Sequence, residues 1–338
     1  MTLSVACAGA GYFSQFHYDA WRRIEGVKLV GAADLDRDAL AARAPDLPHF
    51  SDFGAMFLET RPDLVDIITP PDTHFAIIQG AILAGAQAVI CQKPFCRDLD
   101  EAEAAVYAAA QARVTVVVHE NFRFQPWYRA AARLIADGAL GRVMQISFRL
   151  RPGDGQGPEA YLDRQPYFQK MPRFLIHETG VHWVDTFRFL MGEPESVWAD
   201  LRRLNPAIAG EDAGIVVFGY ANGARAVFDG NRLADHIAEN RRRTMGDCLI
   251  EGDAMSVLID GEGRLFTRMF GTNDWIDTEL NPPVSGFGGD CVHALQSHVV
   301  DALRNGTAPE NTAGDYLNVI RTEQAIYRSH ETGQRMTL

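Results

Sequence analysis

The chain has 338 residues, of which 47% are apolar and 22% charged, and its formal net charge is −12. This composition is typical of a globular protein with room for two domains, and the acidic balance argues against a nucleic-acid or anionic-membrane surface. No apolar run reaches the roughly 18 residues of a membrane span, and the chain enters a predicted strand without a cleavable leader. We therefore expect a cytoplasmic protein. The five cysteines lack the paired spacing of a zinc site or a disulfide framework, so no metal is expected.

A glycine loop between a strand and a helix marks the start of the chain. The apolar run 3–8 is typical of a buried parallel strand, and Gly9-Ala10-Gly11 leads from it into a helical segment, 15–23. Gly9 permits a tight turn. Gly11 lets the backbone approach a pyrophosphate at the helix N-terminus, where unpaired N–H groups favour negative charge. This order predicts a dinucleotide-binding unit.

A second apolar run, 27–33, ends on Asp34, which lies 20 residues past Ser14. An acid at that place can accept hydrogen bonds from both ribose hydroxyls of a dinucleotide. The same carboxylate would repel a 2′-phosphate, which favours NAD over NADP. Because Ser14 replaces the third glycine of the fingerprint, an ordinary turn between strand and helix stays the alternative interpretation.

Strands and helices continue to alternate until the segment that begins at His119. Strands are predicted at 64–68, 88–91 and 114–118, and helices at 36–43, 53–59, 75–83 and 99–112. Thr73 is expected to cap the helix that begins at Phe75. The alternation implies an open parallel sheet with right-handed crossovers, whose ligand lies at the carboxyl ends of the strands. We assign residues 1–123 to this Rossmann domain.

In the second half of the chain, most of the predicted strands follow one another and no longer alternate with helices. Helices are predicted at 126–136, 173–190, 291–304 and 313–330, and strands at 143–150, 197–204, 215–220, 224–228, 247–251, 255–259 and 264–267. Asn222-Gly223 predicts a tight hairpin. The expected fold class is therefore an α/β Rossmann domain followed by an α+β domain, 124–338, with a large, mostly antiparallel sheet. One face of that sheet carries Val, Ile and Phe side chains that need a partner subunit, which predicts a homo-oligomer, either a dimer or a tetramer.

Two groups of residues could carry proton transfer. Lys93 follows the strand 88–91 and could orient or help to deprotonate a substrate hydroxyl; a surface lysine is the alternative. Glu178 and His182 are four residues apart and share a face of the predicted helix. A carboxylate one turn from an imidazole can hold its tautomer and raise its basicity, as a general base requires. A helix-face salt bridge or a satisfied core histidine is the alternative there.

A third group follows the last predicted Rossmann strand. Asn121 and Arg123 alternate in an extended segment and could contact a carboxamide, a ribose or sugar oxygens; a salt bridge at the domain boundary is the alternative. The Gly/Pro-rich loop that starts at Arg151 is unusually long, which favours ligand binding. Its candidate substrate contacts are Tyr161, Asp163 and Arg164.

Several motifs together resemble the glucose–fructose oxidoreductase/inositol dehydrogenase/MocA (Gfo/Idh/MocA) family over essentially the whole chain. They are Gly9-Ala10-Gly11 with His17, Thr69-Pro70-Pro71-Asp72-Thr73-His74, Lys93-Pro94, Asn121-Phe122-Arg123-Phe124, Gly180-Val181-His182-Trp183-Val184-Asp185 and the tail segment 323–329. The resemblance implies NAD(P)-dependent oxidation of a sugar or cyclitol hydroxyl, with Lys93 at the family's catalytic lysine and His182 at its acid/base histidine.

The resemblance also implies which residues contact each ligand. The cofactor contacts are expected to be Gly9, Gly11, Tyr12, Phe13, Asp34, Thr69, Pro70, His74, Gln92 and Lys93. The family usually has Glu where this chain has Gln92, and Asp where it has Glu178. The stretches 119–128, 151–168 and 177–182 are similar to those of D-apiose dehydrogenases, which implies D-apiose as a substrate.

The resulting hypothesis is an NAD-dependent dehydrogenase that oxidises the anomeric hydroxyl of an aldose to a lactone. His182 accepts the hydroxyl proton, Lys93 positions that hydroxyl, and Glu178 orients His182 or binds the substrate. The first alternative is a non-catalytic regulator that senses a dinucleotide or a sugar on the same fold. The second is an inositol or keto-sugar dehydrogenase.

Overall fold

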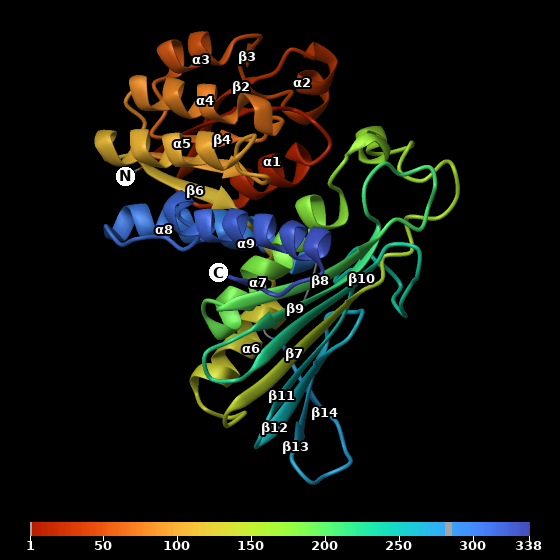
Figure 1. The fold of residues 1–338 in the computed structure, drawn as a ribbon. Helices are drawn as coiled ribbons and strands as arrows, with labels where there is room; N and C mark the ends of the chain where they lie inside the picture. The colour runs from red at the N-terminus through yellow and green to blue at the C-terminus, as the bar shows by residue number, and fades with distance from the viewer. Residues whose placement is uncertain (1, 281–285) are drawn as a thin grey trace. The chain divides into compact units, whose positions relative to one another are not determined.

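The computed structural model describes residues 2–280 and 286–338, which form two compact units (Figure 1). Unit 1 comprises Met1–Asn121 and Val292–Asn318, and unit 2 comprises Phe122–Cys291 and Val319–Leu338. The predicted division, 1–123 and 124–338, missed the return of 292–318 to unit 1. This return depends on tertiary contacts: Asn311 Nδ2 donates to the Glu120 carbonyl at 2.7 Å, and Val117 forms a bridge with Thr312.

Unit 1 contains a six-stranded parallel sheet in the order β3-β2-β1-β4-β5-β6. Its strands are β1 (Leu3–Ala8), β2 (Val27–Ala33), β3 (His49–Phe50), β4 (Leu64–Ile67), β5 (Ala88–Gln92) and β6 (Thr115–His119). Every residue of β4 and β5 is buried, as expected for strands covered on both faces. The predicted Rossmann domain is therefore confirmed. The two-residue strand β3 was not predicted, because it is too short to show a period.

The helices of unit 1 are α1 (Ser14–Arg23), α2 (Arg37–Arg43), α3 (Phe53–Thr60), α4 (Pro71–Leu83), α5 (Leu99–Ala112), α8 (Cys291–Asn305) and the start of α9 (Ala313–Thr332). Asp36, Asp52 and Asp98 cap α2, α3 and α5 by accepting backbone N–H groups of the first turn. The predicted cap at Thr73 is wrong. The helix α4 begins at Pro71, whose fixed φ suits a first helical position, so Thr73 lies inside the first turn and donates to the Pro70 carbonyl.

Unit 2 contains a nine-stranded sheet in the order β14-β13-β12-β11-β7-β10-β9-β8-β15. Its strands are β7 (Val143–Leu150), β8 (Ser196–Arg202), β9 (Ala213–Gly219), β10 (Arg225–Asn231), β11 (Gly246–Gly252), β12 (Met255–Ile259), β13 (Leu265–Met269), β14 (Ile276–Thr278) and β15 (Met336–Thr337). All neighbours pair antiparallel except β10 and β7, which are parallel. The mostly antiparallel second sheet is confirmed, and the short strands β14 and β15 were not predicted.

The core of unit 2 lies between this sheet and the helices α6 (Pro126–Ala136) and α7 (Val181–Met191), which Figure 1 shows beside it. Trp183 of α7 packs on Phe148 of β7 with ring centroids 3.6 Å apart, and Phe148 stacks on Phe228 of β10. Alternate residues of β7, β10 and β11 are buried, as expected for a sheet that covers a core with one face.

The predicted single helix 173–190 is two segments in the structure. A π-helix, η3 (Leu175–Gly180), precedes α7. The short 3₁₀ helices η1 (Phe122–Phe124), η2 (Pro166–Lys170) and η4 (Phe287–Gly289) complete the described elements. In a π-helix the backbone bonds span five residues instead of four, so the spacing argument that placed Glu178 and His182 on one α-helical face does not hold.

No helix in the described part of the chain is both long and apolar enough to cross a membrane.

Candidate active site

The glycine loop after β1 has the geometry that a dinucleotide requires. Gly9 has φ +116°, and a Cβ there would lie 2.8 Å from the Ile68 carbonyl carbon and 2.9 Å from the Thr69 nitrogen, so no larger residue fits. A Cβ on Gly11 would meet nothing within 4 Å, which leaves the space before α1 open to a ligand. This loop therefore fits a pyrophosphate at the N-terminus of α1.

Asp34 lies where β2 ends and faces the same loop. Its Oδ2 accepts from the Ala10 N–H at 2.6 Å, and its Oδ1 accepts from the Asp36 N–H at 2.9 Å. Two backbone donors thus hold the carboxylate beside the glycine loop. A negative charge held there can accept hydrogen bonds from ribose hydroxyls and would repel a 2′-phosphate, so a contact between Asp34 and the cofactor stays a prediction.

The remaining predicted cofactor contacts of unit 1 lie in the loops after its strands or in the first turn of the helix that follows. Tyr12 and Phe13 belong to the loop before α1, while Thr69 and Pro70 connect β4 to α4. His74 is buried in α4 and hydrogen-bonds through Nε2 to the Thr69 carbonyl at 2.8 Å. Burial lowers the pKa of His74, so this group stays a neutral structural histidine near neutral pH.

Lys93 directly follows β5, and the peptide bond to Pro94 is cis. The side chain of the preceding residue, Gln92, is buried, and its Oε1 accepts the Lys93 N–H at 2.8 Å. Asn121, the last residue of the first segment of unit 1, is also buried. No hydrogen-bond partner of its Nδ2 occurs in residues 2–280 and 286–338, so this amide donor is available to a ligand.

In unit 2, His182 lies in the first turn of α7 and is 6% exposed. Its ring stacks face to face on Phe122, with centroids 3.9 Å apart and planes 3° from parallel. Arg123 forms a bidentate pair with Asp185, at 2.7 Å and 2.5 Å. The salt bridge that the sequence left as an alternative for Arg123 is therefore present, and a contact between Arg123 and substrate stays a prediction.

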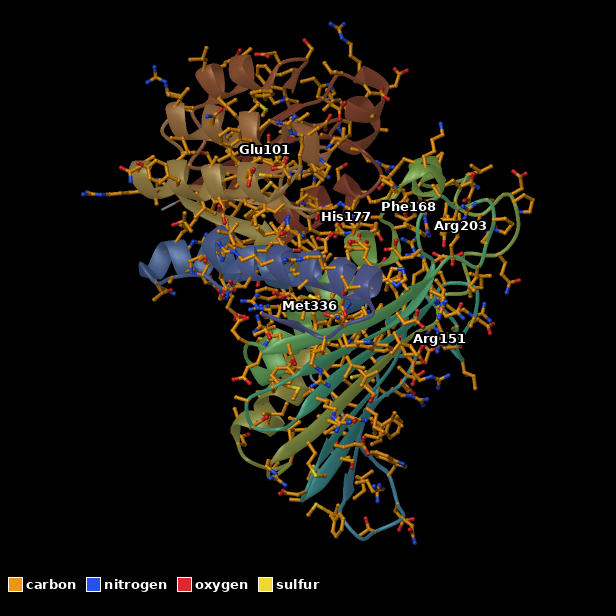
Figure 2. The ribbon with its side chains drawn as sticks, in the orientation of Figure 1. Glu101, Arg151, Phe168, His177, Arg203 and Met336 are labelled. Atoms are coloured by element: carbon orange, nitrogen blue, oxygen red, sulfur yellow. The ribbon has the colours of Figure 1, made fainter. Side chains whose placement is uncertain are left out.

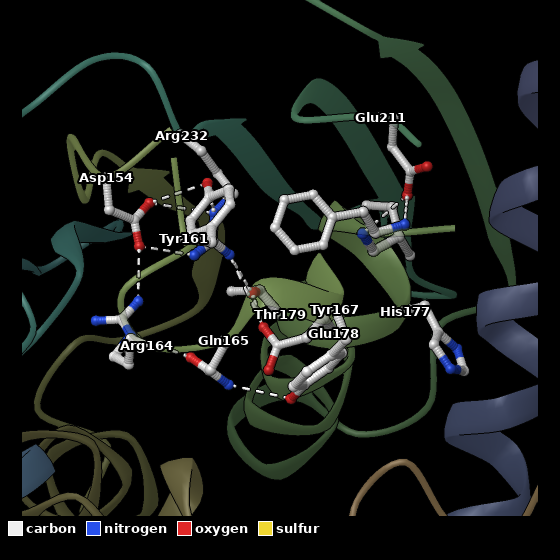
Figure 3. A network of polar contacts seen from close by, with 12 residues as sticks. Asp154, Tyr161, Arg164, Gln165, Tyr167, His177, Glu178, Thr179, Glu211 and Arg232 are labelled. Atoms are coloured by element: carbon white, nitrogen blue, oxygen red, sulfur yellow. Dashed lines mark hydrogen bonds and ion pairs between the residues drawn. The ribbon is translucent and has the colours of Figure 1, made fainter. Parts of the chain in front are cut away.

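A buried cation that the sequence did not reveal lies next to Glu178 (Figure 3). Arg232, which directly follows β10, is 1% exposed. Its Nη1 donates to Thr179 Oγ1 at 2.8 Å and lies 3.8 Å from the Glu178 carboxylate, while Thr179 in turn donates to Glu178 at 2.6 Å. The π-helix η3 is thus held by a hydrogen bond and an ion pair to the guanidinium of Arg232, which follows the distant strand β10.

The same arginine anchors the long loop that follows β7. Asp154 accepts from its Nε at 3.2 Å and its Nη2 at 2.9 Å, and the Tyr161 hydroxyl accepts from Nε at 2.8 Å. The rings of Tyr161, Phe168 and Phe174 surround the guanidinium, with centroids 5.1, 5.7 and 4.8 Å from its carbon. Burial opposes the charge of Arg232, but Asp154 and its other partners outweigh burial and raise the pKa of the guanidinium.

The predicted loop contacts are now placed. Figure 2 labels Arg151 at the start of the loop and Phe168 within its aromatic cluster. Tyr161 is buried against Arg232, Asp163 is exposed, and Arg164 donates to Asp154 at 3.3 Å. In the sequence, Arg232 is only a lone arginine that follows a predicted strand, so nothing there points to its role. Its partners lie 53 to 78 residues away.

The fold, the glycine loop and Asp34 define an NAD-binding oxidoreductase, and comparisons with known proteins agree. Residues 3–120 match the model for the oxidoreductase family with an NAD-binding Rossmann fold, and residues 128–247 match the GFO/IDH/MocA C-terminal domain. The chain belongs to the Gfo/Idh/MocA oxidoreductase family, as its motifs predicted. The prediction of NAD is confirmed with it.

Several relatives span nearly the whole chain. D-apiose dehydrogenase of Paraburkholderia graminis is 32% identical over 98% of this chain and 89% of its own length. D-apiose dehydrogenase of Rhizobium rhizogenes is 28% identical over 99% of this chain and 97% of its own. The crystal structure of an oxidoreductase from Agrobacterium radiobacter in complex with NAD⁺, L-tartaric acid and magnesium has a TM-score of 0.90 and 26% identity, and the match covers 100% of this chain and 98% of that one.

Proposed function

We propose that this protein is an NAD-dependent sugar dehydrogenase that oxidises the anomeric hydroxyl of an aldose to a lactone, with D-apiose as the first substrate to test. The observation that carries the proposal is the match to two D-apiose dehydrogenases over almost the entire chain. Further support comes from two residues. Lys93 follows the carboxyl end of β5, in the same parallel sheet as β1, which leads into the glycine loop, and His182 lies in α7.

In the proposed reaction, His182 accepts the proton of the anomeric hydroxyl, and Lys93 positions that hydroxyl and stabilises developing negative charge. Bound NAD supplies the acceptor for the hydride that leaves the same carbon, which gives the lactone and NADH. The stack on Phe122 keeps the imidazole of His182 in one orientation. Arg232 and Thr179 hold the carboxylate of Glu178, which either orients His182 or binds a sugar hydroxyl. Gly9, Gly11 and Asp34 hold the dinucleotide, and the buried amide of Asn121 contacts the substrate.

The test is NADH formation, measured by absorbance, across a panel of aldoses, keto-sugars and cyclitols with NAD or NADP. We expect turnover of at least one aldose, D-apiose first, and faster turnover with NAD because Asp34 disfavours a 2′-phosphate. Turnover of cyclitols or keto-sugars alone would show that the protein is an inositol or keto-sugar dehydrogenase and not an aldose dehydrogenase. Binding of sugars and NAD without turnover of any of them would instead favour the non-catalytic regulator.

The proposed assembly is a homo-oligomer formed through the outer face of the unit 2 sheet. One register-aligned row crosses this face from β8 to β13, and it is apolar except for one serine. All of its members are half-buried in the single chain: Trp198, Val217, Val227, Ser147, Leu249, Leu258 and Phe266. Removal of these apolar side chains from water lowers the free energy when a second copy of the chain covers them.

Sedimentation at micromolar concentration should therefore show a dimer or a tetramer. Val227→Lys, within the row and next to its central Ser147, is expected to shift the protein toward the monomer, because a charge would be buried without a partner. Leu58→Lys is the matched control, since Leu58 is 79% exposed on α3 of unit 1. A wild-type monomer, or an oligomer that Val227→Lys leaves intact, would contradict this interface.

A further inference from the structure

A chain of hydrogen bonds inside unit 1 ends on the backbone of Lys93. Asp66 of β4 accepts from His17 Nδ1 at 2.8 Å, and His17 Nε2 lies 3.2 Å from Gln92 Nε2. Gln92 Oε1 accepts the Lys93 N–H at 2.8 Å. Asp66 and His17 are 0% exposed and Gln92 is 8% exposed. We call Asp66, His17 and Gln92 the His17 relay.

The donors and acceptors of the relay allow one arrangement. The Lys93 N–H needs an acceptor, so the carboxamide oxygen of Gln92 faces it and the amide nitrogen faces His17. That amide nitrogen can only donate, so His17 Nε2 accepts and the proton of the imidazole is on Nδ1, where Asp66 receives it. Asp66 therefore fixes the tautomer of His17, His17 fixes the orientation of the Gln92 carboxamide, and that carboxamide binds the peptide N–H of Lys93.

Neighbouring groups hold both ends of the relay in place. Trp21 Nε1 donates to the same oxygen of Asp66 at 2.7 Å, and Gln296 Nε2 of α8 lies 3.4 Å from it. The His17 ring packs against His119 with centroids 4.1 Å apart. A buried carboxylate and imidazole are costly compared with apolar side chains of the same shape, so a purely structural role explains the relay poorly.

We propose that His17 is a positioning residue that acts on Lys93 through Gln92, with Asp66 setting its tautomer. The relay fixes the peptide nitrogen of Lys93 and therefore the direction in which its side chain leaves the end of β5. This inference rests on the proposed role of Lys93 in turnover. It also assigns a task to Gln92, whose carboxamide oxygen accepts the Lys93 N–H and whose amide nitrogen faces His17.

The experiment uses the fact that the chain has only three lysines: Lys28, Lys93 and Lys170. Reductive ¹³C-methylation of the whole protein gives few lysine signals in NMR, and Lys93→Met identifies the one from Lys93. Gln92→Met keeps the length of the side chain without its polar atoms, and His17→Leu removes the centre of the relay. We expect both variants to move the Lys93 signal alone and to lower kcat by about 10- to 100-fold, as misplacement of a reacting group does, with the Kd for NAD changed less than about threefold.

Two further variants separate positioning from structure. His17→Gln retains one donor and one acceptor and should recover much of the kcat that His17→Leu loses. Gln87→Met is the matched control, because Gln87 lies just before β5 at its opposite end and bonds to the exposed side of Asp63; it should leave the Lys93 signal and kcat unchanged.

The inference is overturned if folded Gln92→Met keeps the wild-type Lys93 signal and kcat, or if His17→Gln is no better than a folded His17→Leu. Should His17→Leu fail to fold, Gln92→Met decides, since it leaves the His17–Asp66 pair intact. A wild-type protein without turnover on any sugar would remove the proposed function. The relay would still stand in that case if the Lys93 signal moved in Gln92→Met and not in Gln87→Met.

Discussion

Lys93→Met is expected to lower kcat for the sugar substrate by about 10²- to 10⁴-fold, the range that a positioned proton-transfer group contributes. Methionine keeps most of the side-chain length and removes the ammonium that would position the hydroxyl and stabilise its developing negative charge. The Kd for NAD should change little, because the glycine loop and Asp34 hold the dinucleotide through other contacts. Initial rates and equilibrium NAD binding measure the two effects separately.

Lys28→Met is the matched control for this change. Lys28 is exposed on β2 of the same unit, so its loss should alter neither kcat nor NAD binding. Near-normal turnover by Lys93→Met, with normal NAD affinity, would remove Lys93 from the mechanism. A loss of NAD affinity that accounts for the whole fall in rate would assign Lys93 to cofactor binding alone.

Arg232→Met is expected to lower the free energy of unfolding by about 3–5 kcal/mol, the cost of breaking a buried ion pair by removing one partner. The substitution leaves Asp154 and Glu178 without their shared cation and removes the donors that hold Tyr161 and Thr179. Burial already raises the pKa of the Tyr161 phenol, so this side chain stays a neutral group that cannot replace the lost charge. Urea unfolding measures the change.

The control for this prediction is Arg264→Met, which breaks an ion pair with Asp260 in which the arginine side chain is 59% exposed; it should leave the urea midpoint unchanged, because surface pairs contribute little. Arg232→Lys retains the charge without the planar fork and should fall between the wild type and Arg232→Met. Equal midpoints for Arg232→Met and Arg264→Met would show that the loop after β7 does not depend on this arginine.

The sequence predicted the local parts of the fold well, because they are encoded in short-range patterns. The strand–loop–helix–strand order up to Asp34 rests on apolar runs and glycine positions within one unit of structure. The strands β1, β2, β7 and β12 have the predicted bounds. The π-helix before His182 was missed, since periodicity does not distinguish five-residue from four-residue backbone bonds over a single turn.

The candidate site was predicted only where a residue type stands next to a recognisable strand end. Lys93 and Asp34 were proposed in that way, whereas His182 was proposed from its spacing to Glu178 on a predicted helix and from the family resemblance. Arg232 could not, because a lone arginine after a strand resembles many exposed arginines until a distant loop and helix surround it.

The amino-acid sequence alone determined the Rossmann unit, NAD as the cofactor and the family, because each of the motifs that carry them is a short stretch of chain that can be recognised without its tertiary contacts. Only the tertiary structure decided which distant segments meet. It placed β10 parallel to β7, returned 292–318 to unit 1, and joined His17 to Asp66 and Gln92, which are 49 and 75 residues away. The physical reason is that a hydrophobic pattern specifies which face of an element is buried, whereas the partner on that face is selected by the packing and hydrogen bonding of the whole chain.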